Sequence, residues 1–239
     1  MRGRTIFSNY KLKRAAHNMI IEFNGLPGTG KTTVSRELGK CISEEREVIY
    51  TLSLRENKLK RYIRSFFDGS RTLYRLGARF SDSVSGGDKN NRRYALILLK
   101  YYWMYRSFYS FHADDCALLI DQGFVQAFIS IAHGNEITDV TSLDQVLEFL
   151  NKKGIRFISV NCLGDTMLAR NRIISRGSTA GRLDVCDDGE RMAVLNVQQK
   201  NFDIVRARME AIMTPMTDSV DTANSPEDNA IYIKERIGI

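Results

Sequence analysis

The stretch MIIEFNGLPGTGKTT, residues 19–33, decides the fold that this sequence predicts. Its first part, MIIEF, has the apolar and β-branched character of a short buried strand. A glycine-rich segment then ends the strand. Val34, Leu38 and Ile42 follow at the spacing of one face of a helix, so we expect a helix directly after the glycines.

Residues 25–32 have the pattern G-x-x-x-x-G-K-[ST], which is the phosphate-binding loop. In this loop backbone N–H groups surround the phosphates, and glycine permits the close approach because it lacks Cβ and tolerates positive φ. The following helix directs its N-terminal N–H groups and the positive end of its dipole at the same phosphates. The residues expected to bind the nucleotide are Gly25, Gly28, Thr29, Gly30, Lys31, Thr32 and Thr33.

Three side chains are expected to act on ATP and its metal ion. Lys31 is placed to bridge the β- and γ-phosphates, and the Thr32 hydroxyl is placed to ligate Mg²⁺. Residues 116–121, CALLID, predict a buried strand that ends in a carboxylate. Asp121 at that tip is expected to be a second metal ligand. An Asp at a strand end is also a common helix N-cap, but the phosphate loop favours the magnesium role.

Composition bounds the class of protein. The chain has 239 residues, of which 43% are hydrophobic, so we expect residues 19–239 to form one domain. No apolar run approaches the roughly 18 residues that span a bilayer, which predicts a soluble protein without membrane contact. The four cysteines form no C-x-x-C pair. They are expected to be core thiols in a reducing compartment, which indicates a cytoplasmic location and no zinc.

The positive charge is unevenly distributed. Net charge is +7, and many Lys and Arg residues lie in 58–93, which we interpret as a basic segment on the acceptor side of the site. Such a segment suits an anionic ligand, although a solvated helix face has the same composition. Residues 1–18 are basic and contain no acid, and we expect them to form an N-terminal tail.

Strand-like and helix-like stretches alternate through the chain, which predicts right-handed βαβ units and a parallel sheet. The expected fold class is therefore α/β, a three-layer P-loop NTPase fold with helices on both faces of a central parallel sheet. Besides the first strand and 116–121, strands are expected at 47–53, 155–161 and 218–222. Helices are expected at 58–80, 92–111, 122–133, 142–153, before Met213 and after Pro226.

Two stretches are expected to be loops. Residues 81–91 are polar and contain glycine, which favours a loop. Residues 167–191 combine several arginines with glycines, which we interpret as a flexible loop that closes over the transferred group. Its arginines are Arg170, Arg172, Arg176, Arg182 and Arg191.

This set of motifs resembles the P-loop kinases of the thymidylate kinase and nucleoside or nucleotide kinase group, from residue 19 onward. The segments that carry the resemblance are TLSLRE (51–56), YYWMYRSF (101–108), LIDQG (119–123) and RNRIISRGSTAGRLD (170–184). Two departures affect the acceptor side. The Gly-Gly that usually follows Arg-Glu-Pro in the thymidylate enzymes is absent, since Asn57 and Lys58 follow Glu56 here, and Gln122 replaces the arginine after Asp121.

The resemblance implies a role for each matching residue. Lys31, Thr32 and Asp121 would handle ATP and Mg²⁺, and residues 170–191 would form an arginine-bearing lid. Its arginines Arg172, Arg176 and Arg182 would close over the phosphates. Arg55 and Arg106 would hold an anionic acceptor, with Gln122 beside them. The resemblance is also consistent with a homodimer.

We therefore predict an ATP- and Mg²⁺-dependent kinase that transfers the γ-phosphoryl group to a small acceptor, a nucleoside monophosphate or a nucleoside. A monophosphate needs no strong base, whereas a hydroxyl does, and Glu56 is the candidate base. One alternative is a nucleotide-binding regulator. The nearest match to the guanine-reading N-K-x-D, residues 151–154, lacks the Asp. A nucleic-acid end kinase or repair factor is the other alternative, motivated by 58–93.

Overall fold

The computed structural model describes residues 18–50, 69–85, 91–111, 115–177, 181–213 and 216–238. A five-stranded sheet forms its centre, in the order β2-β3-β1-β4-β5, and every neighbouring pair is parallel. This is the predicted parallel α/β sheet. The strands are β1 (Met19–Asn24), β2 (Glu47–Tyr50), β3 (Cys116–Ile120), β4 (Ile158–Leu163) and β5 (Met216–Asp221).

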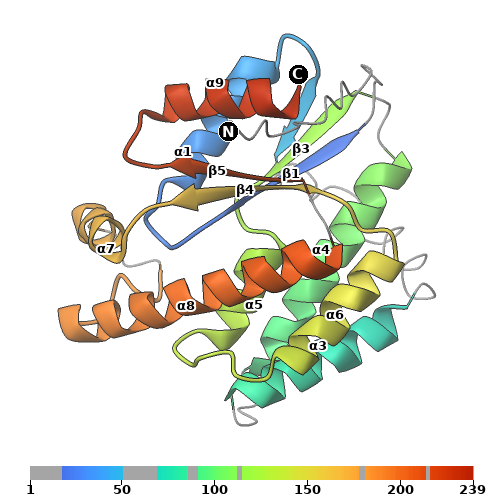
Figure 1. Cartoon of the computed structure of the whole chain (residues 1–239), viewed down its shortest axis with the longest axis vertical. Helices are drawn as coiled ribbons and strands as arrows, with labels where there is room; N and C mark the ends of the chain where they lie inside the picture. The colour runs from blue at the N-terminus through green and yellow to red at the C-terminus, as the bar shows by residue number, and fades with distance from the viewer. Residues whose placement is uncertain are drawn as a thin grey trace, which may run out of the picture.

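Helices cover both faces of the sheet, as Figure 1 shows, and give the expected three layers. On one face lie α1 (Lys31–Ile42) and α9 (Pro226–Ile237). On the other lie α3 (Ser70–Ser85), α4 (Asn91–Phe111), α5 (Phe124–Ala132), α6 (Val140–Lys152) and α8 (Asp188–Met213). The short α7 (Thr166–Ser175) lies beside the carboxyl ends of the strands (Figure 1).

The central strand β1 is buried on both faces, which explains its nearly continuous apolar sequence. Ile21 and Phe23 face the cluster formed with α1 and α9. Ile20, of opposite parity, faces the larger cluster formed with α3, α4, α5, α6 and α8. Glu22 has the same parity as Ile20 and is fully buried, so it places a carboxyl group inside that larger layer.

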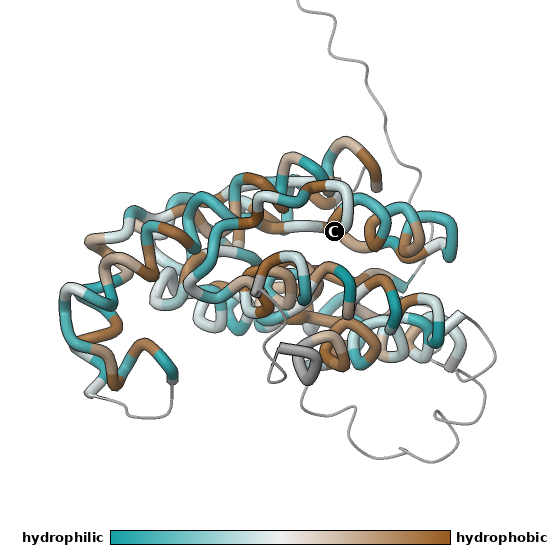
Figure 2. Tube along the Cα trace, turned by 90° about the horizontal axis from the view of Figure 1, so that it is seen from below, coloured by the Kyte–Doolittle hydropathy of each residue, from teal (hydrophilic) through white to brown (hydrophobic). Residues whose placement is uncertain are grey.

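Aromatic side chains of α4 and α5 fill the larger layer. Tyr102, Tyr105 and Phe108 are fully buried, so the aromatic stripe of α4 belongs to the core. Phe128 meets Phe80 edge to face with 5.4 Å between ring centroids, a preferred aromatic geometry. Along the helices hydrophobic and hydrophilic segments alternate (Figure 2), as expected for helices with one face on a core.

Three expected boundaries were wrong. Residues 81–85 continue α3 instead of forming a loop, because Ser81 and Val84 are buried on its inner face and packing overrides local propensity. The fourth strand begins at Ile158, where its ladder with β1 starts, and not at residue 155. Residues 166–175 form α7, whose first turn is capped by Asp165 through a bond from Leu168 N.

Side-chain caps fix the start of two further helices. Asp139 accepts hydrogen bonds from Thr141 N and Ser142 N at the start of α6. Ser225 caps α9, whose first residue is Pro226 as predicted, and Gly238 ends that helix with positive φ. None of the helices in the described part of the chain is long and apolar enough to cross a bilayer.

We expect Phe128→Ala to lower the free energy of unfolding by about 3–5 kcal/mol, because it leaves a cavity between α3 and α5. Urea denaturation followed by circular dichroism measures this difference. Leu96→Ala is the control, since Leu96 is 52% exposed on α4 and its truncation should change stability by less than about 0.5 kcal/mol. Equal effects of the two substitutions would contradict the proposed core.

Candidate functional site

The phosphate loop packs directly against β4 and α7, which leaves no room for side chains at two of its glycines. A Cβ atom on Gly25 would lie 2.5 Å from the Cys162 carbonyl oxygen, and one on Gly28 would lie 2.6 Å from the Ala169 carbonyl oxygen. Both glycines also have positive φ, 145° and 86°. Steric exclusion and backbone conformation therefore both require glycine at these positions.

Lys31 reaches back across the loop. Its Nζ donates to the carbonyl oxygens of Gly25 at 2.9 Å and Leu26 at 2.7 Å. Burial lowers the pKa of Lys31 to about 8, and the negative charge of Asp121 opposes this shift. The ammonium group is thus held at the mouth of the loop.

The start of α1 adds a second source of positive potential. Its N-cap is Gly30, in the left-handed conformation, and the first turn has neither a side-chain cap nor an acidic residue. The N-terminal N–H groups of this 12-residue helix therefore point at the loop, and the helix's own first turn has no carboxylate that competes for them. An anion at this position is favoured by both hydrogen bonding and the helix dipole.

Thr32 and Asp121 meet beside the loop, as the sequence predicted. The Thr32 Oγ1 donates to Asp121 Oδ2 at 2.8 Å, which joins the first turn of α1 to the end of β3. Two hard oxygen atoms side by side fit Mg²⁺, which completes its octahedral shell with water and substrate phosphates. The described residues contain no group of three or more His, Cys, Asp or Glu that could hold a metal alone.

A cavity of about 820 Å³ opens at the loop and extends to both faces of the sheet. Toward α9 its walls include Arg172, Thr222 and Asn229. Toward α5 and α8 the walls are different. They include Gln126, Ser130, His133, Arg182 and Gln198. The loop, with Thr33, and the pair of Asp121 and Gln122 lie between these two sides.

Three of the predicted lid arginines line this cavity. Arg172, on α7, donates from Nη2 to the Thr222 carbonyl oxygen at 2.9 Å, and its guanidinium lies beside Gly30. Arg176 pairs with Asp184 at 2.9 Å across the turn between α7 and α8. Arg182 lies in that same turn and faces the cavity. The structure thus brings Arg172, Arg176 and Arg182 together with Lys31.

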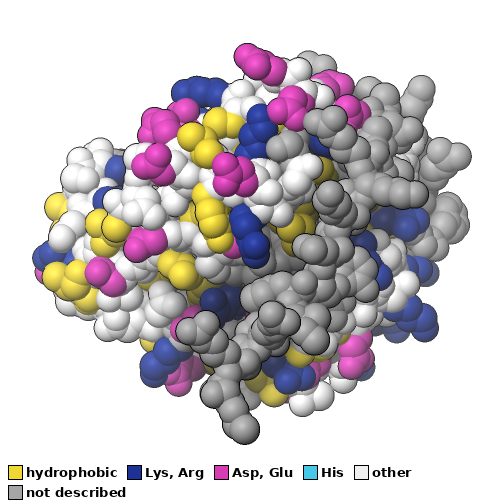
Figure 3. All heavy atoms as spheres, turned by 45° about the horizontal axis from the view of Figure 1, so that its top comes forward, with side chains coloured by type: hydrophobic (Ala, Val, Ile, Leu, Met, Phe, Trp, Pro, Cys, Tyr) yellow, Lys and Arg dark blue, Asp and Glu magenta, His cyan; other side chains and the backbone are white. Residues whose placement is uncertain are grey.

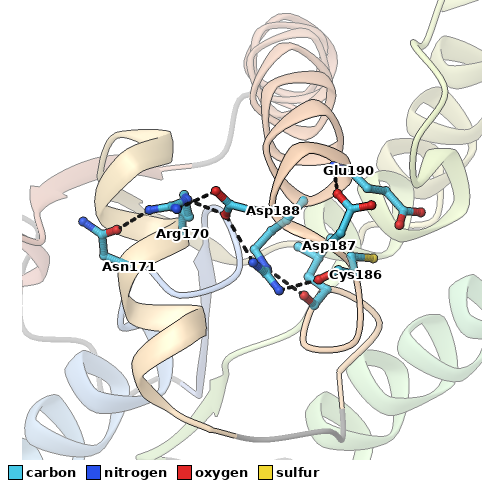
Figure 4. A network of polar contacts seen from close by, with 8 residues as sticks. Arg170, Asn171, Cys186, Asp187, Asp188 and Glu190 are labelled. Carbon is cyan, nitrogen blue, oxygen red and sulfur yellow. Dashed lines mark hydrogen bonds and ion pairs between the residues drawn. The ribbon is translucent and has the colours of Figure 1, made fainter.

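Arg170 and Arg191 have different positions: Arg170 joins α7 to α8, and Arg191 holds the residues that precede α8. Figure 4 shows Arg170 facing Asp188 at the start of α8, with bonds of 2.6 and 2.5 Å to its two carboxylate oxygens. Arg191 is buried and donates to the carbonyl oxygens of Leu183 at 2.9 Å and Cys186 at 2.6 Å. These contacts hold residues 183–188 against α7 and α8.

The arginine-rich stretch is therefore not one flexible loop, contrary to the prediction. Leu183 packs against Ala169, Ile173 and Leu195 and against Leu26 of the phosphate loop. This small apolar cluster connects α7, α8 and the residues between them to the phosphate loop. Arg170 and Arg172 lie on α7, and Arg191 lies on α8. The helices form because burial of the apolar side chains in this cluster stabilises the fold more than the glycines destabilise it.

The predicted acceptor residues are placed differently. Arg55 and Glu56 lie outside the described residues. Gln122 is exposed and lines the cavity next to Asp121. Arg106 donates to the Lys153 carbonyl oxygen, which precedes β4 and lies near the amino ends of the strands. The phosphate loop lies at the carboxyl ends, so the structure does not bring Arg106 to the cavity.

Sequence reasoning missed Gln126, His133 and Gln198, because their approach depends on how α5 and α8 pack. It also gave no role to Glu22, although an acid inside an apolar strand is a visible signal. Burial raises the pKa of Glu22 to about 7, and hydrogen bonds from Tyr105, Val125 and Phe124 oppose the shift. The carboxyl group lies on the side of the sheet covered by α4 and α5, and the ladder partner of Glu22 is Ile120, the residue before Asp121.

Solved structures with a similar fold were compared with this chain. A deoxyadenosine kinase from M. mycoides with bound dATP superposes with a TM-score of 0.53 and 16% identity, over 92% of this chain and 100% of that one. This chain has the fold of the P-loop kinases. The same M. mycoides kinase with bound dCTP gives a TM-score of 0.51 and 14% identity, over 92% and 98% of the two chains.

A shikimate kinase from Acinetobacter baumannii in complex with shikimate is a weaker match, with a TM-score of 0.46 and 15% identity over 93% of this chain and 94% of that one. No family model and no curated protein sequence matches this chain. The P-loop kinase fold therefore rests on structure and on the loop motif.

Gly28→Ala should abolish nucleotide binding, because the added Cβ atom would collide with the Ala169 carbonyl and oppose the positive φ. Isothermal titration with Mg·ATP measures the effect, and we expect affinity to fall by at least about a hundredfold. Gly154→Ala is the matched control, because Gly154 also has positive φ but nothing lies within 4 Å of its Cβ position. Equal loss in both variants would contradict the steric argument.

Glu22 should make stability depend on pH. Its pKa is raised from 4.5 to about 7 on folding, so the folded state favours the protonated form. This contribution is complete below about pH 4.5 and is lost as pH rises through 7, at a cost of roughly 3 kcal/mol. Urea unfolding of wild type and Glu22→Gln between pH 5 and 8 measures it. The difference between the two proteins should change over this range, and a constant difference would contradict the assignment.

Proposed function

We propose that this chain is an ATP- and Mg²⁺-dependent kinase that transfers the γ-phosphoryl group to a small acceptor of the nucleoside or nucleoside monophosphate class. One observation carries the proposal: Lys31, the Thr32–Asp121 pair and the lid arginines converge on one cavity that has a second, differently lined side. Phosphoryl transfer needs this combination of positioning and positive charge, and little covalent help.

On the loop side, the chain supplies fixed positive groups. Lys31 and the first turn of α1 would hold the β- and γ-phosphates. Arg172, between the loop and Thr222, would orient the nucleotide on the α9 side. Arg176 and Arg182 would neutralise the charge that develops on the transferred group.

Thr32 and Asp121 would hold Mg²⁺, which when bound supplies charge neutralisation at the phosphate oxygens. The chain prepares this position by placing the two oxygen atoms 2.8 Å apart on separate elements. Asp121 is anchored by the sheet and Thr32 by α1. Because the backbone of each residue adjoins a regular element, the two side chains start close to each other.

The acceptor side offers uncharged hydrogen-bonding groups as well as Arg182. Its walls toward α5 and α8 include Gln126, Ser130 and Gln198. The Oε1 atoms of Gln126 and Gln198 are buried and accept no hydrogen bond from the described residues. Burial, with the charge of Arg182 as a second cause, lowers the pKa of His133, so its imidazole is neutral at pH 7. A buried amide oxygen that lacks a hydrogen-bond donor is suited to accept a hydrogen bond from a hydroxyl or amino group of an acceptor.

A small acceptor is preferred to a nucleic acid for this chain. In the part of the face that is coloured in Figure 3, Lys and Arg side chains lie among Asp and Glu side chains. Nucleic-acid binding depends on clustered positive charge along the backbone path. We prefer a P-loop kinase for a small molecule to the end-kinase alternative, because one structure with a similar fold is a deoxyadenosine kinase with bound dATP.

A panel of nucleosides, nucleoside monophosphates and other small hydroxyl compounds, assayed for ADP release with Mg·ATP, tests the proposal. Lys31→Ala should lower kcat at least about a thousandfold, because no other group replaces its charge between the phosphates. Lys40→Ala is the control: Lys40 lies on the same helix, is exposed and pairs only with Glu37 in the described contacts. Transfer that survives Lys31→Ala would refute kinase activity at this loop.

Glu56→Gln separates the two acceptor classes. If the acceptor is a hydroxyl, the substitution should lower kcat by about a hundredfold or more while ATP binding is retained, because a general base is lost. If the acceptor is a monophosphate, turnover should change little. Single-turnover rates with the best nucleoside and the best monophosphate from the panel measure the difference.

A further inference from the structure

The carboxyl group of Glu22 is the one acidic side chain on β1, and it is fully buried. It lies on the face of the sheet that packs on α4 and α5. Burying an acid without partners costs several kcal/mol, so a retained buried carboxyl group is expected to have a compensating set of contacts. Those contacts connect three elements.

Glu22 accepts hydrogen bonds from both neighbouring helices. The Tyr105 hydroxyl, on α4, donates to Oε2 at 2.6 Å. The Val125 N–H, in the first turn of α5, donates to Oε1 at 2.8 Å. The N-cap of α5 is Gly123, which offers no side-chain cap. Glu22, on β1, therefore caps α5: its side chain accepts from the first turn of that helix, where N–H groups have no partner within the helix.

The approach of Glu22 to this helix start is close. A Cβ atom on Gly123 would lie 2.0 Å from Glu22 Cδ, so the contact exists only because residue 123 is glycine. Tyr105 is fixed in turn, since its ring packs on Phe124 at 5.0 Å and on Phe157 at 5.7 Å between centroids. The carboxyl group is thus held from two directions.

These contacts determine the turn that carries Asp121. Ile120, the last residue of β3, is the ladder partner of Glu22 in β1. Val125, five residues later, is bonded to the Glu22 side chain. One residue therefore holds the turn at both ends, through its backbone register at Ile120 and through its carboxyl group at Val125. Asp121 and Gln122 lie between these two attachments.

We propose that Glu22 is a positioning residue for Asp121, which acts by fixing the turn from β3 into α5 against α4. This inference rests on the proposed function, because it assigns Asp121 to the metal. Groups that hold a metal ligand in place, without touching the metal, typically change metal affinity by 10- to 100-fold when they are removed.

The test compares Glu22→Leu, Glu22→Gln and Tyr105→Phe with the wild-type chain. Glu22→Leu should raise the Mg²⁺ concentration that gives half-maximal rate by about tenfold, with the KM for ATP at saturating Mg²⁺ changed less than about twofold. Glu22→Gln should stay within about threefold of wild type, because its amide oxygen still accepts from Val125 and its amide nitrogen can donate to Tyr105. Tyr105→Phe should lie between them.

Asn201→Leu is the matched control. Asn201 is a buried polar residue on α8 that accepts from Ile137 N at 2.9 Å and donates to the Asn135 carbonyl oxygen at 2.8 Å. Its replacement should lower thermal stability without changing the Mg²⁺ dependence. If Glu22→Leu lowers the melting temperature as Asn201→Leu does and leaves the half-saturating Mg²⁺ unchanged, Glu22 has a structural role alone and the proposal is wrong.

Two readouts do not depend on catalysis. Hydrogen exchange of the Val125 amide should be slow in wild type and at least tenfold faster in Glu22→Leu, with smaller acceleration in Tyr105→Phe. Titration of Mn²⁺ with ADP present, followed by electron paramagnetic resonance, should show the same order of affinities. If no acceptor yields ADP but Mn²⁺ affinity still falls in Glu22→Leu, the proposed function fails and the positioning role stands. Unchanged exchange and unchanged Mn²⁺ affinity would overturn the positioning role.

Discussion

The parallel pairing of β1 with β3 is the constraint on which the site depends. Parallel strands end at the same edge of a sheet, so the loop after β1 and the carboxylate after β3 are brought together by backbone geometry. The 2.8 Å contact between Thr32 and Asp121 follows from this pairing. A shift of the register by one residue would turn Asp121 toward the other face and separate the two oxygen atoms.

The layer beneath this edge combines an apolar core with one buried acid. Glu22 joins α4, β1 and α5 in a region otherwise filled by Tyr105, Phe124 and Phe157. An apolar residue would suit the core better on its own, because it costs no desolvation. The acid instead supplies hydrogen bonds to a helix start, which packing alone cannot supply. The core next to the site therefore restricts the positions of the residues that form the site.

The arginines of residues 170–191 occupy two kinds of position. Arg170 and Arg191 bind carboxylate and carbonyl groups between α7 and α8 and hold the turn in shape. Arg172, Arg176 and Arg182 extend from the same elements into the cavity. The apolar cluster that contains Leu183 and Leu26 connects both sets to the phosphate loop. The arginines that line the cavity are therefore held in place by arginines that do not line it.

The sequence by itself determined the strand, loop and helix of residues 19–42, the need for Gly25, Gly28 and Gly30, and the positions of Lys31, Thr32 and Asp121. These depend on local conformation and on a motif whose spacing is fixed by phosphate geometry. Only the tertiary structure decided that Arg106 faces the opposite edge of the sheet from the loop, that Arg170 joins α7 to α8, and that Glu22 caps α5. Those outcomes depend on contacts between residues far apart in the chain, where helix packing sets the direction of each side chain, and neither composition nor periodicity encodes that direction.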